Sequence, residues 1–158
     1  DQFMKQGVPR WTTTDRQIQA AYDALVQAAC PCVVVVHSQG ANFGFNAALN
    51  APDKVRALIA VEPSGAPPAT AEAARVKDIP HLVVWGDRIG AEPFWNRVQQ
   101  NIARWQDQIR TAGGSADTLD LPANGIRGNS HMPMMDTNSD EVAARIQQWM
   151  ESKRLMRD

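Results

Sequence analysis

The stretch that most constrains this chain is a run of β-branched residues that ends abruptly in small and polar ones. Residues 32–36 read Cys-Val-Val-Val-Val, and His-Ser-Gln-Gly follows at 37–40. So continuous an apolar run predicts a strand buried on both faces, as in a parallel sheet covered by helices. Residues 39–49 are rich in small residues and predict a helix directly after the strand. The chain is therefore expected to pass from a buried strand into a helix within one tight turn.

A turn of this kind places Ser38 beyond the carboxyl end of its strand. The strand and helix backbones approach each other closely there, and Gly40, Ala41 and Gly44 are small enough to permit this. The start of the helix offers backbone N–H groups and the positive end of its dipole. We therefore expect the backbone N–H of Gln39 to stabilise a developing oxyanion. The alternative is that Ser38 only caps a helix in an ordinary loop.

The rest of the chain alternates between expected strands and helices. Capping boxes at Thr14–Gln17 and Asn138–Glu141 predict the starts of the first helix and the last. Strands that alternate with helices predict a parallel sheet with right-handed crossovers. The further strands are expected at Val55–Val61, His81–Trp85 and Thr118–Leu121, and the helices over 15–29, near Thr70–Val76, over Phe94–Ile109 and up to Met150.

Composition limits the kind of protein this is. With 158 residues, 44% of them hydrophobic, the chain is long enough for one domain with a core. The net charge of −1 leaves no basic footprint for nucleic acid or an anionic membrane, so we expect small-molecule chemistry. No apolar run approaches the roughly 18 residues of a membrane span. The first residues lack both an initiator methionine and a signal-peptide pattern, so the chain is expected to be processed or truncated.

Two cysteines flank Pro31. Cys30 and Cys32 are interpreted as too close for an ordinary disulfide and too few for a metal site. We therefore expect buried or free thiols, and the pair does not identify a redox compartment.

A serine hydroxyl is a weak nucleophile and needs a histidine base within hydrogen-bonding distance. The chain has three histidines. We expect His37 to point to the opposite side of the turn from Ser38, and His81 to begin its strand at the far end of the sheet. His131 remains as the candidate base, in a loop between the last strand and the last helix. The alternative is an ordinary histidine in a surface loop.

The base in turn needs an acid that orients it. Glu62 ends the apolar strand in LIAVEPSG, at the sheet edge where ligands and catalytic groups gather in parallel sheets. A carboxylate at the end of an apolar strand is costly unless it is used. Glu62 is therefore the first candidate for the acid. The alternative is a glutamate that caps a loop amide or pairs with an arginine.

The segment Val36–Gly40 resembles the nucleophile elbow G-x-S-x-G of the α/β-hydrolase family, with Val36 in place of the first glycine. In most members the acid follows the seventh strand, commonly three residues after a glycine. Here Ile89 stands three residues after Gly86, and Asp87 is only a back-up acid. The order serine, glutamate, histidine is similar to that of a small group of bacterial esterases, as are EPSG at the glutamate and GNSH at the histidine. The resemblance covers Val33–Met150.

The resemblance implies an α/β-hydrolase fold of which this chain is the C-terminal half, holding strands five to eight. It implies hydrolysis of a small-molecule carboxylic ester through an acyl-serine intermediate, without metal or cofactor. Ser38 would attack, His131 would move the proton, Glu62 would orient His131, and Gln39 would hold the oxyanion. A substrate pocket is expected around His37 and the three methionines of the following loop, Met132, Met134 and Met135.

The main expected partner is the N-terminal half of the same fold, in the same polypeptide or a separate chain. It would pair with Val33–Val36 and supply the second oxyanion N–H. The resemblance leaves a homodimer and a periplasmic or secreted location open. An amidase, thioesterase or lactonase would share the triad. An inactive hydrolase-fold binding module is the alternative from another class.

Overall fold

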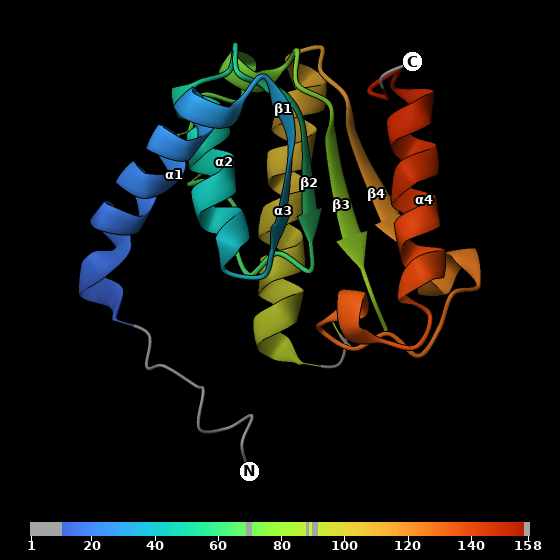
Figure 1. Cartoon of the computed structure of the whole chain (residues 1–158). Helices are drawn as coiled ribbons and strands as arrows, with labels where there is room; N and C mark the ends of the chain where they lie inside the picture. Colours follow the sequence, from blue (N-terminus) through green and yellow to red (C-terminus); the bar gives the residue numbers. More distant parts are fainter. Residues whose placement is uncertain (1–10, 69–70, 88, 90–91, 157–158) are drawn as a thin grey trace.

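A four-stranded parallel sheet organises the computed structural model, which describes residues 11–68, 71–87, 89 and 92–156. Its strand order is β1-β2-β3-β4, so each strand lies beside its neighbour in the sequence (Figure 1). All strands therefore end at the same edge, the lower one in Figure 1. The strands are β1 (Cys32–His37), β2 (Val55–Val61), β3 (His81–Trp85) and β4 (Ala116–Asp120).

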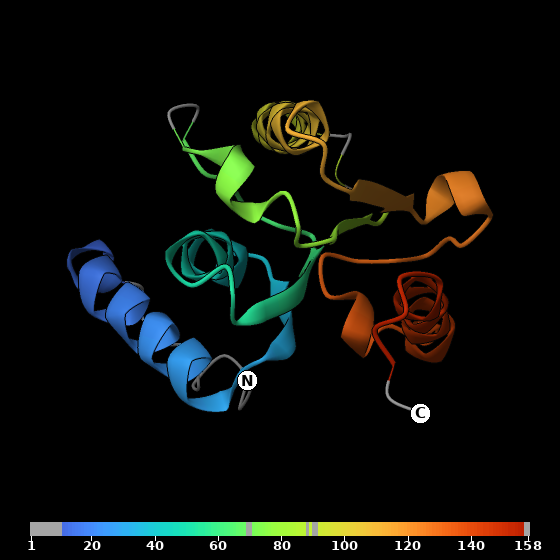
Figure 2. The same cartoon turned by 90° about the horizontal axis from the view of Figure 1, so that it is seen from above.

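Helices cover both faces of the sheet (Figure 2). One face is covered by α2 and α3, with α1 packed on the outside of α2, and the other face by α4. The helices are α1 (Asp15–Ala29), α2 (Gly40–Asn50), α3 (Pro93–Thr111) and α4 (Ser139–Ser152). Short 3-10 helices are found at Thr12–Thr14, Ala73–Val76, Pro122–Asn124 and Pro133–Met135.

The sheet divides the apolar core into two clusters. The larger one joins side chains of α2 and α3, such as Phe45 and Ile102, to Leu58 and Val83 of the central strands. The smaller one lies under α4. It contains Ile59, Val61, Leu82, Val84, Leu121, Ile126 and Val142. The central strands β2 and β3 bury side chains on both faces, as their continuous apolar sequences predict.

The expected elements are present, with small shifts. Strands β2 and β3 begin and end where they were predicted, whereas β4 begins two residues earlier than expected. Residues 73–76 form a 3-10 helix, and residue 70, where that helix was expected to begin, lies outside the described residues. The long α3 ends just before Gly113, whose φ of 89° favours glycine.

Both predicted capping boxes are wrong, although both helices begin where expected. The side-chain hydroxyl of Thr14 donates to the carbonyl of Trp11 at 2.7 Å instead of accepting from its own helix. The amide of Asn138 is likewise engaged elsewhere, with the carbonyl of Arg127 and the side chain of Asn129. Other polar partners therefore compete successfully for both capping side chains.

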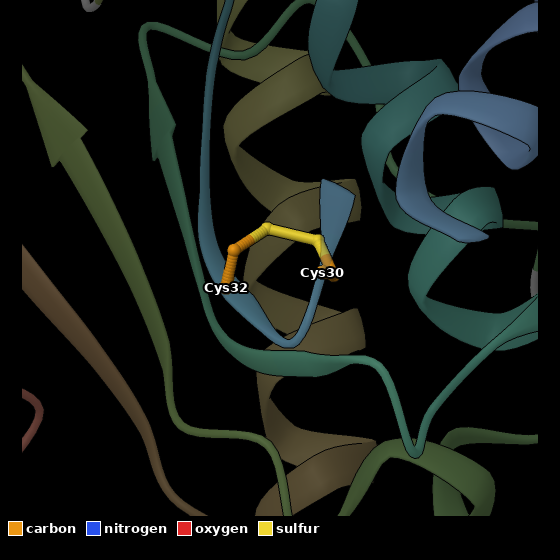
Figure 3. The surroundings of a disulfide bond; sticks show 2 residues. All are labelled: Cys30 and Cys32. Carbon is orange, nitrogen blue, oxygen red and sulfur yellow. A yellow bond between two sulfur atoms is a disulfide. The ribbon is translucent and has the colours of Figure 1, made fainter. Parts of the chain in front are cut away.

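The prediction of free thiols is also wrong. Cys30 and Cys32 form a disulfide that joins the end of α1 to the start of β1 (Figure 3). The tight turn through Pro31 brings the two Cα atoms to 4.4 Å, which lies within the range that disulfides span. Separation along the chain was therefore a poor guide to the distance between the two sulfur atoms.

The two edge strands of the sheet differ in character. On β4, Asp117 accepts hydrogen bonds from Lys153 and Trp149, both at 2.8 Å, and Thr118 and Asp120 are polar as well. On β1, the only partner strand among the described residues is β2, and the side chain of Val35 is 60% exposed. A groove of about 410 Å³ lies between α1 and β1 and is lined mainly by apolar side chains, including Tyr22 and Leu25.

Candidate active site

Ser38 lies on the tight turn between β1 and α2. Its φ of 51° is left-handed, a conformation that is uncommon for residues with a side chain. The backbone N–H of Ser38 donates to the carbonyl of Val61, and its own carbonyl accepts from Ala41, both at 3.1 Å. A Cβ on Gly44 would approach Val36 to 2.8 Å, so the close packing of α2 on β1 requires glycine there. The neighbouring strand and helix thus hold Ser38 in its unusual conformation.

The hydroxyl of Ser38 is joined to a histidine and a carboxylate by side-chain hydrogen bonds. His131 Nε2 lies 2.8 Å from Ser38 Oγ, and His131 Nδ1 lies 3.2 Å from Glu62 Oε2. The two ring nitrogens of one imidazole therefore face a hydroxyl and a carboxylate at the same time. The three residues come from three different loops at the carboxyl edge of the sheet.

Glu62 follows β2 and is 1% exposed. Its φ of 46° turns the chain at this point, and its backbone N–H donates to the carbonyl of Val84 at 2.9 Å. Oε1 accepts a hydrogen bond from the backbone N–H of Gly86, which leaves Oε2 for His131. Burial raises the pKa of Glu62, while the hydrogen bonds from Gly86 and His131 oppose that shift.

The loop that carries His131 is held by two aspartates. Asp136 accepts hydrogen bonds from the backbone N–H of Ser130 at 2.7 Å and from the Ser130 hydroxyl at 2.8 Å. The bond from the backbone N–H is the main cause of the lowered pKa of Asp136. Asp87 Oδ2 accepts from the backbone N–H of Asn129 at 2.9 Å. The back-up acid is therefore engaged with the backbone of the loop, whereas the acid bonded to the ring of His131 is Glu62.

Two other aromatic rings contact His131. The ring centroids of His37 and Trp95 each lie 4.9 Å from that of His131. His37 Nε2 also lies 2.6 Å from the backbone carbonyl oxygen of His131. The prediction that His37 points away from this side of the turn is therefore wrong.

Trp95 was missed by sequence reasoning. Its sequence signal is the position of an aromatic residue in the first turn of α3, the helix that begins beyond the carboxyl end of β3. Phe94 beside it is 53% exposed, and the two rings meet edge to face at 5.2 Å. The start of α3 therefore brings apolar surface to the same place as His131.

The remaining predicted site residues have the following positions. Gln39 immediately precedes α2, so its backbone N–H belongs to the start of that helix. Met132, Met134 and Met135 are exposed, at 40%, 48% and 65%. These methionines follow His131 directly, and their part in a substrate pocket stays a prediction.

His81 lies at the opposite end of the sheet, as expected. It begins β3, is 1% exposed, and its Nδ1 lies 2.8 Å from the carbonyl of Ile79. Burial lowers its pKa to about 4. Within the residues that the structure describes, no group of three or more histidine, cysteine, aspartate or glutamate side chains is placed to hold a metal ion. In the same part of the chain, no helix has the length and hydropathy needed to cross a membrane.

Comparison with known structures agrees with the fold. The structure is similar to that of a bacterial esterase, with a TM-score of 0.85 and 32% sequence identity, over 95% of this chain and 48% of the esterase chain. The chain thus has the fold of the C-terminal half of an α/β-hydrolase.

Comparison with curated sequences points to the same class. The chain is 22% identical to a probable secreted lipase, phiG, from a fungal species, over 84% of this chain and 49% of the lipase. No protein-family model matches the chain. It therefore spans about half the length of the two hydrolases that it resembles.

Proposed function

We propose that the protein hydrolyses carboxylic esters through an acyl-serine intermediate, with Ser38, His131 and Glu62 as its catalytic triad. The observation that supports this most strongly is the continuous hydrogen-bonded path from Ser38 Oγ through His131 to Glu62. A hydroxyl, an imidazole and a carboxylate in this order are the parts that activate a serine nucleophile. The similarity to an esterase and a lipase supports the same reaction class.

In the first half of the proposed reaction, Ser38 Oγ forms a bond to the ester carbonyl carbon while His131 Nε2 takes the hydroxyl proton. The carbonyl oxygen becomes an oxyanion beside the start of α2, where the Gln39 N–H stabilises it. His131 then gives its proton to the alkoxide oxygen as the ester C–O bond breaks. The alcohol leaves, and the acyl group stays on Ser38.

In the second half, water repeats the same steps in place of Ser38. His131 takes a proton from water, the hydroxide adds to the acyl carbon, and the bond to Ser38 breaks as the serine regains its proton. The products are the carboxylic acid and the free enzyme. Glu62 keeps the Nδ1–H of His131 directed at Oε2 and stabilises the imidazolium that forms in each half.

We also infer that a strand of the N-terminal half of the same fold, in the same polypeptide or in a second chain, pairs with the open edge of β1. A strand edge with an exposed valine is a template for further pairing, whereas β4 carries the polar residues that protect a natural edge. The apolar groove beside β1 would be covered by that segment. The same half would supply the second oxyanion N–H.

Hydrogen exchange on the full-length protein tests this pairing. Amides of β1 that donate to a new strand should exchange as slowly as those of the central β2, because both would lie inside a sheet. Fast exchange at the outward-facing amides of β1 would contradict the pairing. It would leave the triad proposal untouched.

The reaction is tested by comparing Ser38→Ala with Ser152→Ala in the full-length protein. Ser152 is an exposed serine at the end of α4 and serves as the matched control. Over a panel of short and long acyl esters, thioesters, amides and lactones, Ser38→Ala should lose essentially all turnover and Ser152→Ala should keep it. Hydrolysis that survives in Ser38→Ala would contradict the proposal. Preferential cleavage of amides, thioesters or lactones would contradict ester specificity and retain the mechanism.

A further inference from the structure

His37 connects the nucleophile's turn to the base's loop. It is the residue before Ser38, and its Nε2 lies 2.6 Å from the backbone carbonyl oxygen of His131. A carbonyl oxygen only accepts hydrogen bonds, so the Nε2 of His37 must carry a proton and donate it. The ring of His37 also packs against the ring of His131, with centroids 4.9 Å apart. The contact thus reaches both the backbone and the side chain of His131.

This hydrogen bond differs from the other contacts that hold the loop. Asp87 and Asp136 bind the backbone N–H groups of Asn129 and Ser130, which precede His131. The bond from His37 is made to the peptide group of His131 itself. It therefore fixes the His131 backbone against the same turn that carries Ser38.

We propose that His37 is a positioning residue that keeps His131 Nε2 aligned with Ser38 Oγ through its hydrogen bond to the His131 carbonyl. This inference rests on the proposed function of the triad. The three side chains of the triad come from separate loops, so their alignment depends on contacts between those loops. A displacement of about 1 Å between reacting groups costs about a hundredfold in rate. One hydrogen bond placed next to the nucleophile prevents such a displacement of the base.

The proposal is tested with two substitutions at His37. His37→Leu removes the donor, whereas His37→Gln places an amide N–H at a similar reach. His37→Leu should lower kcat about tenfold to a hundredfold, with KM changed less than about twofold, because the base is misaligned while substrate binding remains. His37→Gln should restore kcat to within about threefold of the wild type, because the donor is restored. Circular dichroism and thermal melting establish that each variant folds.

A second donor-free variant keeps the test decisive. If His37→Leu fails to fold, His37→Phe replaces it, since phenylalanine keeps a ring against His131 and lacks the donor. A donor-free variant as active as the wild type would overturn the proposal, and so would an equal loss in His37→Gln. Failure of the triad proposal would look different: Ser38→Ala would remain active whatever happens at His37.

Discussion

The two ends of the sheet each hold a buried ionisable side chain, and they use it differently. Glu62, at the carboxyl end, and His81, at the amino end, are both 1% exposed. Both oxygens of Glu62 have hydrogen-bond partners, the backbone of Gly86 and the ring of His131. His81 has one partner, the nearby carbonyl of Ile79, and its Nε2 has none among the described residues.

The backbone shows the same contrast. Ser38 and Glu62 at the carboxyl end have left-handed φ angles of 51° and 46°. Such conformations cost on the order of 1 kcal/mol or more for residues with a side chain. At the amino end, the ring of His81 stacks beside Phe45, with centroids 6.3 Å apart, inside the packed core. The carboxyl end thus holds polar groups in place at a cost in stability, whereas the amino end is organised by packing.

The largest effect at the carboxyl end is expected from a change at Glu62. Glu62→Gln keeps the size and an acceptor for Gly86 but removes the charge that we propose orients His131, so kcat should fall about 10³-fold to 10⁴-fold. Burial raises the pKa of Glu62, so the charged form is disfavoured by folding, and thermal melting should show an equal or higher melting temperature for the variant.

Asp87→Asn is the matched control for this change. It alters a carboxylate that holds the loop backbone and not the ring of His131, so kcat should fall about tenfold or less. Steady-state kinetics on both full-length variants rank the two acids. The opposite ranking would assign the acid role to Asp87, the other carboxylate at the carboxyl end of the sheet.

At the amino end the expected effect is on stability. The pKa of His81 falls from 6.5 in the unfolded chain to about 4 in the folded one, because burial disfavours its charge. Between these two pH values the unfolded state binds one more proton than the folded state. The contribution of His81 to the stability of the folded state is therefore fully present above pH 6.5 and is lost as the pH falls. Near pH 4 the free energy of unfolding has fallen by about 3 kcal/mol, a factor of about 10² in the unfolding equilibrium.

Urea unfolding at pH 7 and pH 4.5 checks this, with His81→Leu as the comparison. The variant lacks the titrating group, so its stability should fall less between the two pH values than that of the wild type. Its kcat at neutral pH should be close to that of the wild type, since His81 lies at the far end of the sheet. Identical pH dependence in both proteins would show that His81 does not titrate as described.

A smaller effect is expected from Gly86→Ala. The new Cβ would lie 3.0 Å from Glu62 Oε1 and 3.2 Å from Asn129 Cβ, so the acid or the loop must move by a few tenths of an ångström. We expect kcat to fall about threefold to tenfold because Glu62 then orients His131 less well. KM for the same ester and the far-ultraviolet circular dichroism should stay nearly unchanged. An unaltered kcat would indicate that the position of Glu62 tolerates more movement than the geometry suggests.

Much of the fold was predictable because its signals are local. The apolar runs at β2 and β3 predict buried strands, and the helices follow from their spacing of apolar residues. The juxtaposition of Ser38, Glu62 and His131 was predictable for a related reason. Parallel strands end at one edge, so Ser38 and Glu62, just beyond the carboxyl ends of β1 and β2, were expected to lie close together. His131, in the loop between β4 and α4, was predicted by eliminating the other two histidines and by the family resemblance.

The wrong predictions concern side chains whose partners depend on the tertiary structure. Thr14 and Asn138 bind groups outside their helices, and sequence spacing does not show such competitors. The direction of the His37 side chain depends on the turn at Ser38, whose backbone is left-handed. The alternation of side chains along a strand does not predict this direction. The disulfide was not predicted because the Cα distance between Cys30 and Cys32 is determined by the turn between them.

The assignment of Ser38 as the nucleophile is tested by labelling the full-length protein with a fluorophosphonate and locating the adduct by peptide mass spectrometry. Ser38 Oγ should attack phosphorus and displace fluoride, which leaves one phosphonyl group on the peptide that contains Ser38. Labelling should be lost in Ser38→Ala and strongly slowed in His131→Ala, since the base activates the hydroxyl. An active protein that carries the adduct on another residue, or that hydrolyses esters without being labelled, would contradict the assignment of Ser38 as the nucleophile.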